Sequence, residues 1–430
     1  MRKEIGVGML GLGVVGSGVA RALTDKTEEL AGQIGASLAL KRVLVRDPNK
    51  KRSISLEPGL LTTNAREVIN NSDVDIVIEV IGGEYPALDY INQAINSGKH
   101  VVTANKEVIA KHGYKLLSSA QAHNVDLRYE ASVGSGIPLI SAFQQDLAAN
   151  DISAIHAILN GTTNYILTEM AQGELDFPSA LKQAQQLGYA EPDPANDIDG
   201  TDASYKLAIL ASLAFHVPLS PKDIYREGIS RLAAQDFRYA REFGYVIKLL
   251  AIARQDGEAI EARVHPTFTP QNSQLAKVDG VYNAIQVQSN LAGKLVFYGP
   301  GAGALPTTSA IMADVLTIAR NICRGVNNTP RIELSQRLAV KAMSNVHTRY
   351  YFRLNVVDRP GVLAQISKVL GDNLISISSV LQKESNPESQ TAEIVIMTHP
   401  AEEKGVQKAL KEVNQLPLVN EVSNFIRVEG

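Results

Sequence analysis

Three glycines near the start of the chain constrain its fold more than any other feature. Gly11, Gly13 and Gly16 form the pattern GxGxxG, directly after the apolar run IGVGML and at the start of a helix that we predict from about Val14 to Leu30. Gly11 would permit a tight turn, Gly13 would let the backbone approach a pyrophosphate, and Gly16 would allow close helix–strand packing. The helix N-terminus would offer N–H donors to the anion. This context predicts a dinucleotide site, with contacts from Gly11, Leu12, Gly13, Val14, Val15 and Gly16.

The first third of the chain continues as alternating strands and helices. VDIVIEVIGG and KHVVTAN read as buried strands, and the amphipathic helix between them has Pro86 at its start and Gly98 just past its end. Continuous apolar strands that alternate with helices indicate a parallel sheet covered on both faces. We therefore predict a Rossmann domain, a doubly wound parallel sheet over 1–135, completed by a helix near 305–323.

The remaining sequence predicts two further domains, as 430 residues allow. Two helical segments and several amphipathic strands, the latter from Tyr245 to Tyr298, predict an α+β catalytic and dimerisation domain over 136–323. The polar segment RGVNNTPRIELSQ predicts a linker over 324–348. Beyond it, the order strand, helix, strand, strand, helix, strand predicts a ferredoxin-like βαββαβ domain over 349–430.

Charge and hydropathy limit the class of protein. A net charge of −3 gives no reason to expect nucleic acid binding. No stretch has the roughly 18 apolar residues that a membrane span requires, and glycines in the N-terminal apolar run argue against a signal peptide. The single cysteine, Cys323, cannot form an internal disulfide, which is typical of a reducing compartment. We expect a cytoplasmic protein.

The segment VRDPNKKR, after the second predicted strand, bears on which nicotinamide cofactor binds. An acid at this position would accept from the ribose 2′-OH, whereas a basic side chain would pair with a 2′-phosphate. Arg46 and Lys50 favour NADP(H) over NAD(H), while Asp47 leaves NAD(H) open.

Two charged residues in GTDASYKLAIL form the strongest candidate for chemistry. Asp202 and Lys206 lie four residues apart on a predicted helix, so both side chains can face one cleft. That spacing alone is usual for a surface ion pair. Upstream, however, stand the helix start NGTTNYIL and an acidic loop that contains Glu191.

These blocks together resemble the homoserine dehydrogenase family. The resemblance runs in order through GLGVVG, VTANKE, EASVGSGIP, NGTTNYIL, GYAEPDPANDIDGTDASYK and YGPGAGALPTTSA. RLNVVDRPGVLAQI resembles an ACT domain, as in the threonine-regulated form, and no kinase-like segment precedes Met1, so we expect the monofunctional enzyme. The resemblance implies an NAD(P)-dependent oxidoreductase that reversibly reduces L-aspartate 4-semialdehyde to L-homoserine, in the branch leading to threonine, methionine and isoleucine.

The resemblance also implies roles for single residues. Lys206 matches the family's proton donor, and an ammonium there would stabilise charge on the aldehyde oxygen. Asp202 matches its neighbour, which holds the substrate amine or a water, and Glu191 matches the acid that binds the amino group. Lys106 matches a second lysine near substrate and nicotinamide, and Thr162 is a further expected substrate contact. For the cofactor we expect contacts from Thr103, Lys106 and Gly303.

EASVGSGIP resembles the family's monovalent cation site. Glu130 would contribute one oxygen, and the carbonyls of Val133, Ser135 and Ile137 the others. Hard oxygen ligands suit sodium, which would shape the loop. A glycine is common in the family where Ser135 stands, a change that matters only if the backbone needs a positive φ.

The C-terminal domain predicts regulation. The resemblance implies that a threonine effector binds near Asp358, Pro360, Gly361 and Asn373, in a homodimer or homotetramer. Two other functions stay open at this point: a Rossmann dehydrogenase of a different amino-acid semialdehyde, and a non-catalytic amino-acid sensor.

Overall fold

The computed structural model describes residues 4–326, 338–386 and 390–429. It divides into two compact units, which we describe separately. The first comprises Met1–Ile152, Tyr205–Lys222 and Gln288–Arg337, and the second Ser153–Ser204, Asp223–Val287 and Leu338–Gly430. The middle of the predicted linker, residues 327–337, lies outside the described residues. Among the described residues, no helix is both long and apolar enough to cross a membrane.

A parallel sheet forms the centre of the first unit. Its strand order is β3-β2-β1-β4-β5-β6, and every neighbouring pair is parallel. This order, in which the chain reverses direction across the sheet between β1 and β4, is the Rossmann arrangement. The strands are β1 (Glu4–Leu10), β2 (Ser37–Leu44), β3 (Leu61–Thr62), β4 (Ile76–Glu79), β5 (His100–Thr103) and β6 (Leu127–Arg128).

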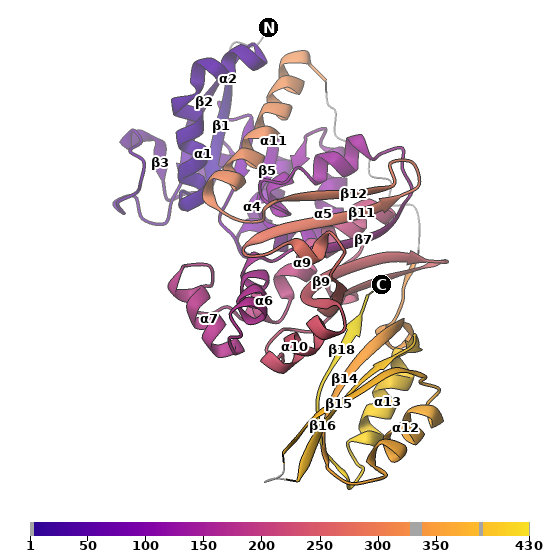
Figure 1. The fold of residues 1–430 in the computed structure, drawn as a ribbon. Helices are drawn as coiled ribbons and strands as arrows, with labels where there is room; N and C mark the ends of the chain where they lie inside the picture. Colours follow the sequence, from indigo (N-terminus) through magenta and orange to yellow (C-terminus); the bar gives the residue numbers. More distant parts are fainter. Residues whose placement is uncertain (1–3, 327–337, 387–389, 430) are drawn as a thin grey trace. The chain divides into compact units, whose positions relative to one another are not determined.

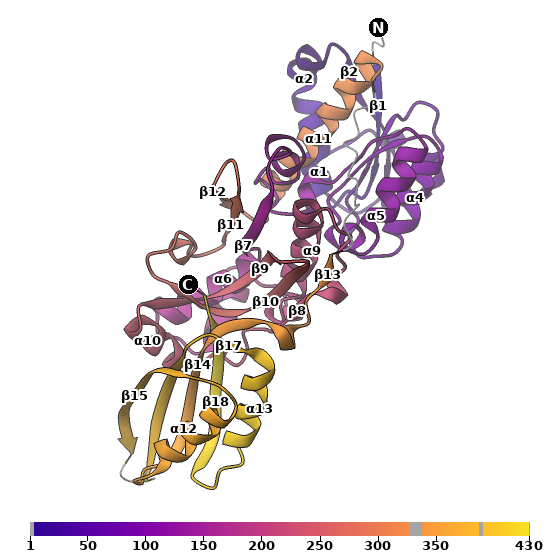
Figure 2. The same ribbon diagram turned by 90° about the vertical axis from the view of Figure 1, so that its right-hand side faces the viewer.

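Helices cover this sheet, and one of them comes from much later in the chain (Figure 1). The long helix α11 lies beside α1 in both Figure 1 and Figure 2, and Ile311, Val315 and Ile318 share a core with Val19 and Leu23. The helices are α1 (Val14–Asp25), α2 (Thr27–Ile34), α3 (Arg66–Ile69), α4 (Ala87–Asn96), α5 (Lys106–Ala122) and α11 (Ala304–Arg324). The unit also holds β12 (Lys294–Pro300).

The helical stretch predicted from about Val14 to Leu30 is divided into two helices. The first helix ends at Asp25, Lys26 leaves the helical region with φ −113° and ψ 21°, and a second helix starts at Thr27. The Thr27 hydroxyl donates to the carbonyl of Leu23 at 2.8 Å. Such side-chain bonds to the backbone compete with the helical ladder and bend it.

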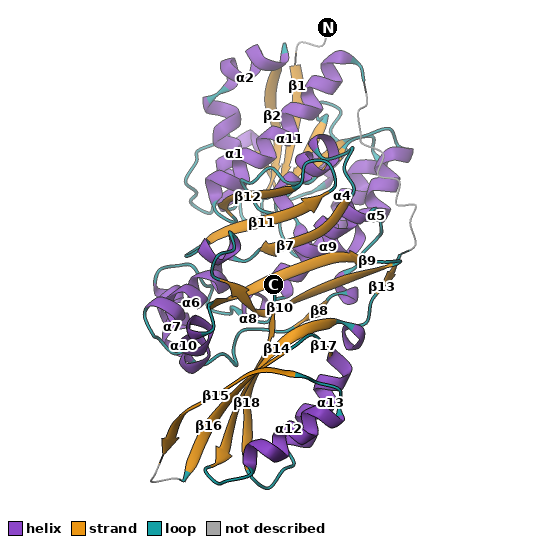
Figure 3. Ribbon diagram, turned by 45° about the vertical axis from the view of Figure 1, so that its right-hand side comes forward, coloured by secondary structure: helices purple, strands orange, loops and turns teal. Residues whose placement is uncertain are grey.

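A second sheet organises the other unit (Figure 3). Its strands follow the order β11-β7-β9-β10-β18-β14-β16-β15. Four of them are β7 (Ile152–Ile158), β9 (Tyr245–Asp256), β10 (Ala259–Pro270) and β11 (Tyr282–Ser289), with the short β8 (Tyr225–Arg226) and β13 (Ala339–Val340) beside β10. The helices here are α6 (Gly161–Gln172), α7 (Phe177–Gln186), α8 (Ala195–Ile198) and α10 (Ala234–Glu242). Helix α9 (Thr201–Phe215) begins in this unit.

The C-terminal residues have the predicted βαββαβ order. The elements are β14 (His347–Val357), α12 (Val362–Asp372), β15 (Ile377–Asn386), β16 (Thr391–Thr398), α13 (Glu403–Val413) and β18 (Val419–Val428), with the short β17 (Ala401–Glu402) in addition. Both helices lie on one face of the four longer strands (Figure 2). Apolar residues of the strands, such as Phe352 and Ile394, share one core with Ile366 and Val406 of the helices.

Candidate active site

The glycine turn after β1 has the geometry that its sequence predicts. Gly11 has a φ of +109°, and a Cβ there would lie 2.9 Å from the carbonyl oxygen of Val80. A Cβ at Gly16 would lie 2.5 Å from the carbonyl oxygen of Gly11, so only glycine allows this approach. At Gly13, by contrast, a Cβ would have no other atom within 4 Å. Open space at the N-terminus of α1 is what an incoming pyrophosphate requires.

The turn after β2 presents basic side chains to solvent. Arg46 and Lys50 are exposed. The Asp47 carboxylate accepts a hydrogen bond from the backbone N–H of Asn49 at 2.8 Å, and Arg52 donates to the carbonyls of Asp47 and Lys50. One carboxylate oxygen of Asp47 is therefore used within the turn, while the side chains of Arg46 and Lys50 can reach an external anion.

The carboxyl ends of β4 and β5 are joined by a buried carboxylate. Glu79 is fully buried, and the Thr103 hydroxyl donates to its Oε2 at 2.5 Å. The same hydroxyl accepts from the backbone N–H of Asn105 at 3.0 Å. The Thr103 hydroxyl is thus held inside the protein, so a contact with cofactor would fall to its backbone. Lys106, half-buried, follows directly as the first residue of α5.

The start of α6 gathers the polar residues of the predicted substrate site. Asn160 caps this helix, because its Oδ1 accepts from the backbone N–H of Thr163 at 2.8 Å. Its Nδ2 donates to Asp197 at 2.6 Å and to Asp202 at 2.9 Å. The Thr162 hydroxyl donates to the carbonyl of Tyr189 at 2.7 Å. One asparagine therefore fixes both the helix start and the Asp202 carboxylate.

Asp202 and Lys206 both lie on α9 and both are nearly buried. Their exposed fractions are 4% and 8%. Glu191, in the loop before α8, is exposed. Buried charged groups are retained where they are paired or functional, so this pair differs from the surface ion pair that its spacing alone suggests.

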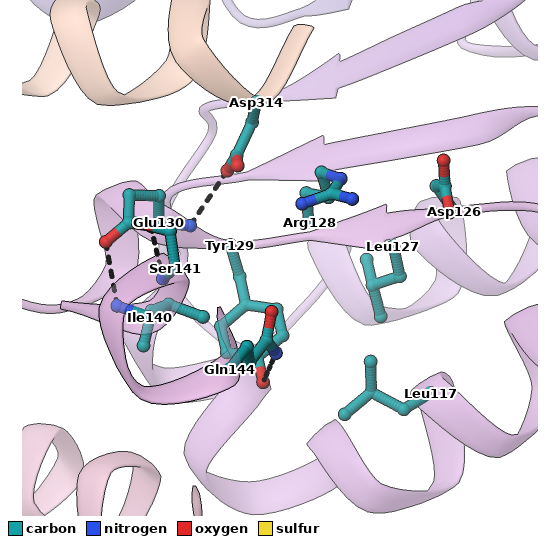
Figure 4. A pocket seen from close by; sticks show the side chains of 10 residues that line it. All are labelled: Leu117, Asp126, Leu127, Arg128, Tyr129, Glu130, Ile140, Ser141, Gln144 and Asp314. Atoms are coloured by element: carbon teal, nitrogen blue, oxygen red, sulfur yellow. Dashed lines mark hydrogen bonds between the residues drawn. The ribbon is translucent and has the colours of Figure 1, made fainter. Parts of the chain in front are cut away.

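The loop around Glu130 is organised by carboxylates (Figure 4). The Glu130 side chain accepts from the backbone N–H groups of Leu139, Ile140 and Ser141 at 2.6 to 2.8 Å. Its own backbone N–H donates to Asp314 of α11 at 2.8 Å. Burial raises the pKa of Asp314 to about 7; the bond from Glu130 opposes this rise and the Glu130 charge adds to it. The Glu130 carboxylate thus shapes the loop, which leaves its main-chain carbonyl as the candidate ligand.

Residues 133–137 form a tight turn whose main-chain carbonyl oxygens are candidate ligands for a cation. Gly134 and Ser135 have φ of +70° and +51°, so the backbone at Ser135 does need the conformation that glycine prefers. Within the described part of the chain, no hydrogen bond to the carbonyls of Val133, Ser135 or Ile137 is found. Buried carbonyls normally have partners, so these three fit a hard cation chemically. The Ser135 hydroxyl lies 2.7 Å from that of Thr307 in α11.

The late glycine turn leads into α11. Gly303 precedes this helix with a φ of +123°. Leu305 in its first turn is 78% exposed.

The predicted effector residues lie at both ends of α12. Asp358 and Pro360 are exposed, and Gly361 precedes the helix with a φ of +93°. At the other end, the Asn373 side chain donates to Glu412 at 2.7 Å and to the carbonyl of Val369 at 2.9 Å. The helix start offers backbone N–H groups, while the Asn373 amide donors serve the domain itself.

Sequence reasoning missed three of these residues. Asn160 begins the motif NGTTNYIL and Asp314 lies just after YGPGAGALPTTSA, but both act through hydrogen bonds that spacing does not reveal. Glu79 had a visible signal, because it is the single charge inside the apolar run IVIEVIGG. A carboxylate in a buried strand requires partners, and that requirement could have drawn attention to it.

Comparisons with known proteins agree with this geometry. Family models described as "Homoserine dehydrogenase, NAD binding domain", "Homoserine dehydrogenase" and "ACT domain" match residues 11–130, 138–316 and 350–418. A homoserine dehydrogenase of Bacillus subtilis is 39% identical over 428 residues, which cover 100% of this chain and 99% of the relative.

Solved structures give the same result. A homoserine dehydrogenase from Thiobacillus denitrificans matches with a TM-score of 0.93 and 42% identity, covering 100% of this chain and 99% of its own. A hyperthermophilic archaeal homoserine dehydrogenase in complex with NADPH matches with a TM-score of 0.62 and 25% identity, covering 73% of this chain and 97% of its own. The full-length match, the Rossmann sheet and the C-terminal domain together show that the chain belongs to the homoserine dehydrogenase family.

Proposed function

We propose that this protein oxidises L-homoserine to L-aspartate 4-semialdehyde and, in the reverse reaction, reduces the semialdehyde to homoserine. Lys206, Asp202 and Lys106 are the proposed catalytic residues. The observation that carries the proposal is the buried pair Asp202 and Lys206 one turn apart on α9, with Asp202 held by Asn160. A lysine in this setting can take up or release a proton at the substrate oxygen.

The chain's own groups then divide the work. Bound nicotinamide cofactor supplies or accepts the hydride at the substrate carbon. Lys206 donates to the aldehyde oxygen, stabilises its growing negative charge and delivers the proton. Asp202 and the exposed Glu191 hold the substrate ammonium. Thr162, at the start of α6, is a further substrate contact. Lys106 binds substrate beside the nicotinamide. Because Asn160 fixes Asp202 before substrate arrives, little reorganisation is needed at the moment of reaction.

For the cofactor, we propose NADP(H) in preference to NAD(H). The exposed Arg46 and Lys50 would pair with a 2′-phosphate, while Asp47 is partly engaged with Asn49. The glycine turn would hold the pyrophosphate, and Gly303 would close over the cofactor. The NADPH named with the archaeal relative supports this choice.

We further propose that sodium binds the carbonyls of Glu130, Val133, Ser135 and Ile137. The carbonyl of Glu130 is the proposed ligand because its carboxylate is already engaged by three backbone N–H groups. Sodium would fix the turn rather than take part in chemistry. Replacing sodium chloride by choline chloride at equal ionic strength should lower activity, and restoring sodium should recover it.

The C-terminal domain would bind threonine at the start of α12, near Asp358, Pro360 and Gly361, with Asn373 at the helix end. In keeping with the family, we propose a cytoplasmic homodimer or homotetramer. Light scattering measures the mass directly, and threonine added to the assay tests the effector.

The decisive assay follows NADPH or NADH formation from L-homoserine at alkaline pH. Turnover with NADP above that with NAD supports both substrate and cofactor. Arg46→Ala should raise the KM for NADP and leave that for NAD nearly unchanged, with Arg21→Ala, on α1, for comparison. Absence of turnover with both cofactors would contradict the assignment of the substrate.

A further inference from the structure

Glu79 is the last residue of β4 and its only charged side chain. It has no exposed surface. Burial raises the pKa of this carboxyl, while hydrogen bonds from Thr103 and from the backbone of Ile81 and Gly82 lower it. A carboxylate in the middle of a parallel sheet is costly, and so its place calls for a reason.

The Glu79 carboxylate binds the two turns that follow β4 and β5. Oε1 accepts from the backbone N–H of Ile81 at 2.7 Å and of Gly82 at 3.4 Å, in the turn before α4. Oε2 accepts from the Thr103 hydroxyl at 2.5 Å, at the end of β5. The two oxygens thus act only as acceptors, one for each turn.

A second set of bonds closes the link on the other side. Thr103 accepts from the backbone N–H of Asn105 at 3.0 Å, and the Asn105 side chain donates to the carbonyl of Gly83 at 2.7 Å. Asn105 also caps α5, because its Oδ1 accepts from the N–H of Val108 at 3.1 Å. Lys106 is the next residue. The position of the Lys106 backbone therefore depends on Asn105, and through Thr103 on Glu79.

We propose that Glu79 is a positioning residue for the hydride-transfer step: it fixes the turns after β4 and β5 against each other, and thereby sets where Lys106 meets substrate and nicotinamide. This rests on the role proposed above for Lys106. Ligands in open parallel sheets bind outside the carboxyl ends of the strands, which is where both turns lie.

The carboxylate suits this task better than its amide analogue. A glutamine would place an NH₂ group against either the N–H groups of Ile81 and Gly82 or the Thr103 hydroxyl. Facing Thr103, it would reverse that hydrogen bond and turn the hydroxyl proton away from residue 79. The strand packing would stay intact, while the link from β4 to Asn105 would change.

The test compares Glu79→Gln with wild type and with Glu67→Gln, a surface carboxylate paired with Arg42. Single-turnover hydride transfer from homoserine to bound NADP should fall roughly 10- to 100-fold in Glu79→Gln. The Kd for NADPH, from nicotinamide fluorescence, should stay within about threefold, because the Glu79 carboxylate bonds to Ile81, Gly82 and Thr103 and not to the glycine turn. Glu67→Gln should match wild type. Thr103→Val, which removes the connecting hydroxyl, should show a similar loss, and the double variant should lose little more.

A Glu79→Gln rate equal to that of an active wild type overturns this inference and leaves the proposed function standing. A loss of rate that merely follows lost NADPH binding and a lowered Tm assigns Glu79 a structural role and also overturns it. If Glu79→Gln does not fold, a normal rate in Thr103→Val overturns it equally. A wild type that does not oxidise homoserine overturns the proposed function first, and the role of Glu79 with it.

Discussion

At the scale of single residues, Asn160 controls the substrate side of the site. Its amide faces two carboxylates, those of Asp197 and Asp202, and its oxygen caps α6. We predict that Asn160→Asp keeps the cap, since aspartate caps helices as well as asparagine, but places a third negative charge beside the other two. Like charges at this distance repel and raise a carboxyl pKa.

Activity of Asn160→Asp should therefore fall roughly 10- to 100-fold near neutral pH. Asn160→Ser, which keeps a cap without adding charge, is the matched variant and should retain more activity. Steady-state assays and circular dichroism of both variants measure this. Equal activity in the two variants would show that the charge is harmless.

The residues that sequence reasoning found and missed differ in how they act. Gly11 and Gly16 could be predicted because backbone sterics dictate glycine at both positions, and the structure has the close approaches expected. At Gly13 the protein leaves room for a Cβ, so its role beside a pyrophosphate stays a prediction. Glu79 and Asn160 act through hydrogen bonds between segments distant in sequence, so no local pattern reveals their partners.

At the scale of elements, the crossing of α11 over α1 depends on Gly18. A Cβ there would lie 2.4 Å from the Thr308 hydroxyl oxygen, which has no hydrogen-bond partner among the described residues. We predict that Gly18→Ala lowers the free energy of unfolding by roughly 1 to 3 kcal/mol through overpacking. Thr308→Ala alone should cost less, and the double variant should recover most of the loss. Urea unfolding measures all three; additive losses would contradict the close contact.

Element order was more predictable than element ends. Buried strands and the βαββαβ order follow from hydrophobic runs and their spacing, which tertiary packing then preserves. The break at Lys26 was missed because the polar run TDKTEE around it contains no glycine or proline to mark a helix end. Only the Thr27 side-chain bond and the backbone turn reveal the interruption.

At the scale of the whole molecule, the second unit joins its C-terminal domain to the preceding sheet by strand pairing and buried charge. Thr267 and Phe268 of β10 pair with Arg427 and Val428 of β18. Arg427 is 1% exposed and binds Glu403 at 2.5 Å and Glu227 at 2.8 Å. We predict that Arg427→Met destabilises the protein by about 3 to 5 kcal/mol, since it leaves the buried Glu403 carboxylate without its charged partner.

Thermal unfolding of Arg427→Met tests this, with Lys408→Met, on the exposed face of α13, as control. The control should stay within about 0.5 kcal/mol of wild type. A stable Arg427→Met would mean that water or rearrangement compensates the two carboxylates.

Glu429, close to Arg427 in the sequence, predicts that the protein loses stability in acid. Burial raises the pKa of Glu429, but a hydrogen bond with His156 and the charge of Arg263 outweigh it and hold the pKa at about 2, against an ordinary 4.5. A lowered folded-state pKa adds stability above pH 4.5 that is lost as the pH falls toward 2. We expect Glu429→Gln to be less stable at pH 7 by roughly 1 to 3 kcal/mol and its unfolding to vary less between about pH 5 and pH 3. A parallel pH dependence in both proteins would contradict this.

The most direct test of the proposed chemistry is oxidation of L-homoserine by wild type and by Lys206→Ala, with NADP in excess. We predict turnover by wild type and a kcat lower by roughly 10²- to 10⁴-fold in Lys206→Ala, with an unchanged circular dichroism spectrum. Lys222→Ala, exposed just beyond α9, should behave as wild type. Full activity in Lys206→Ala would contradict the role of this lysine, because the proton would then come from another group, with Lys106 the next candidate.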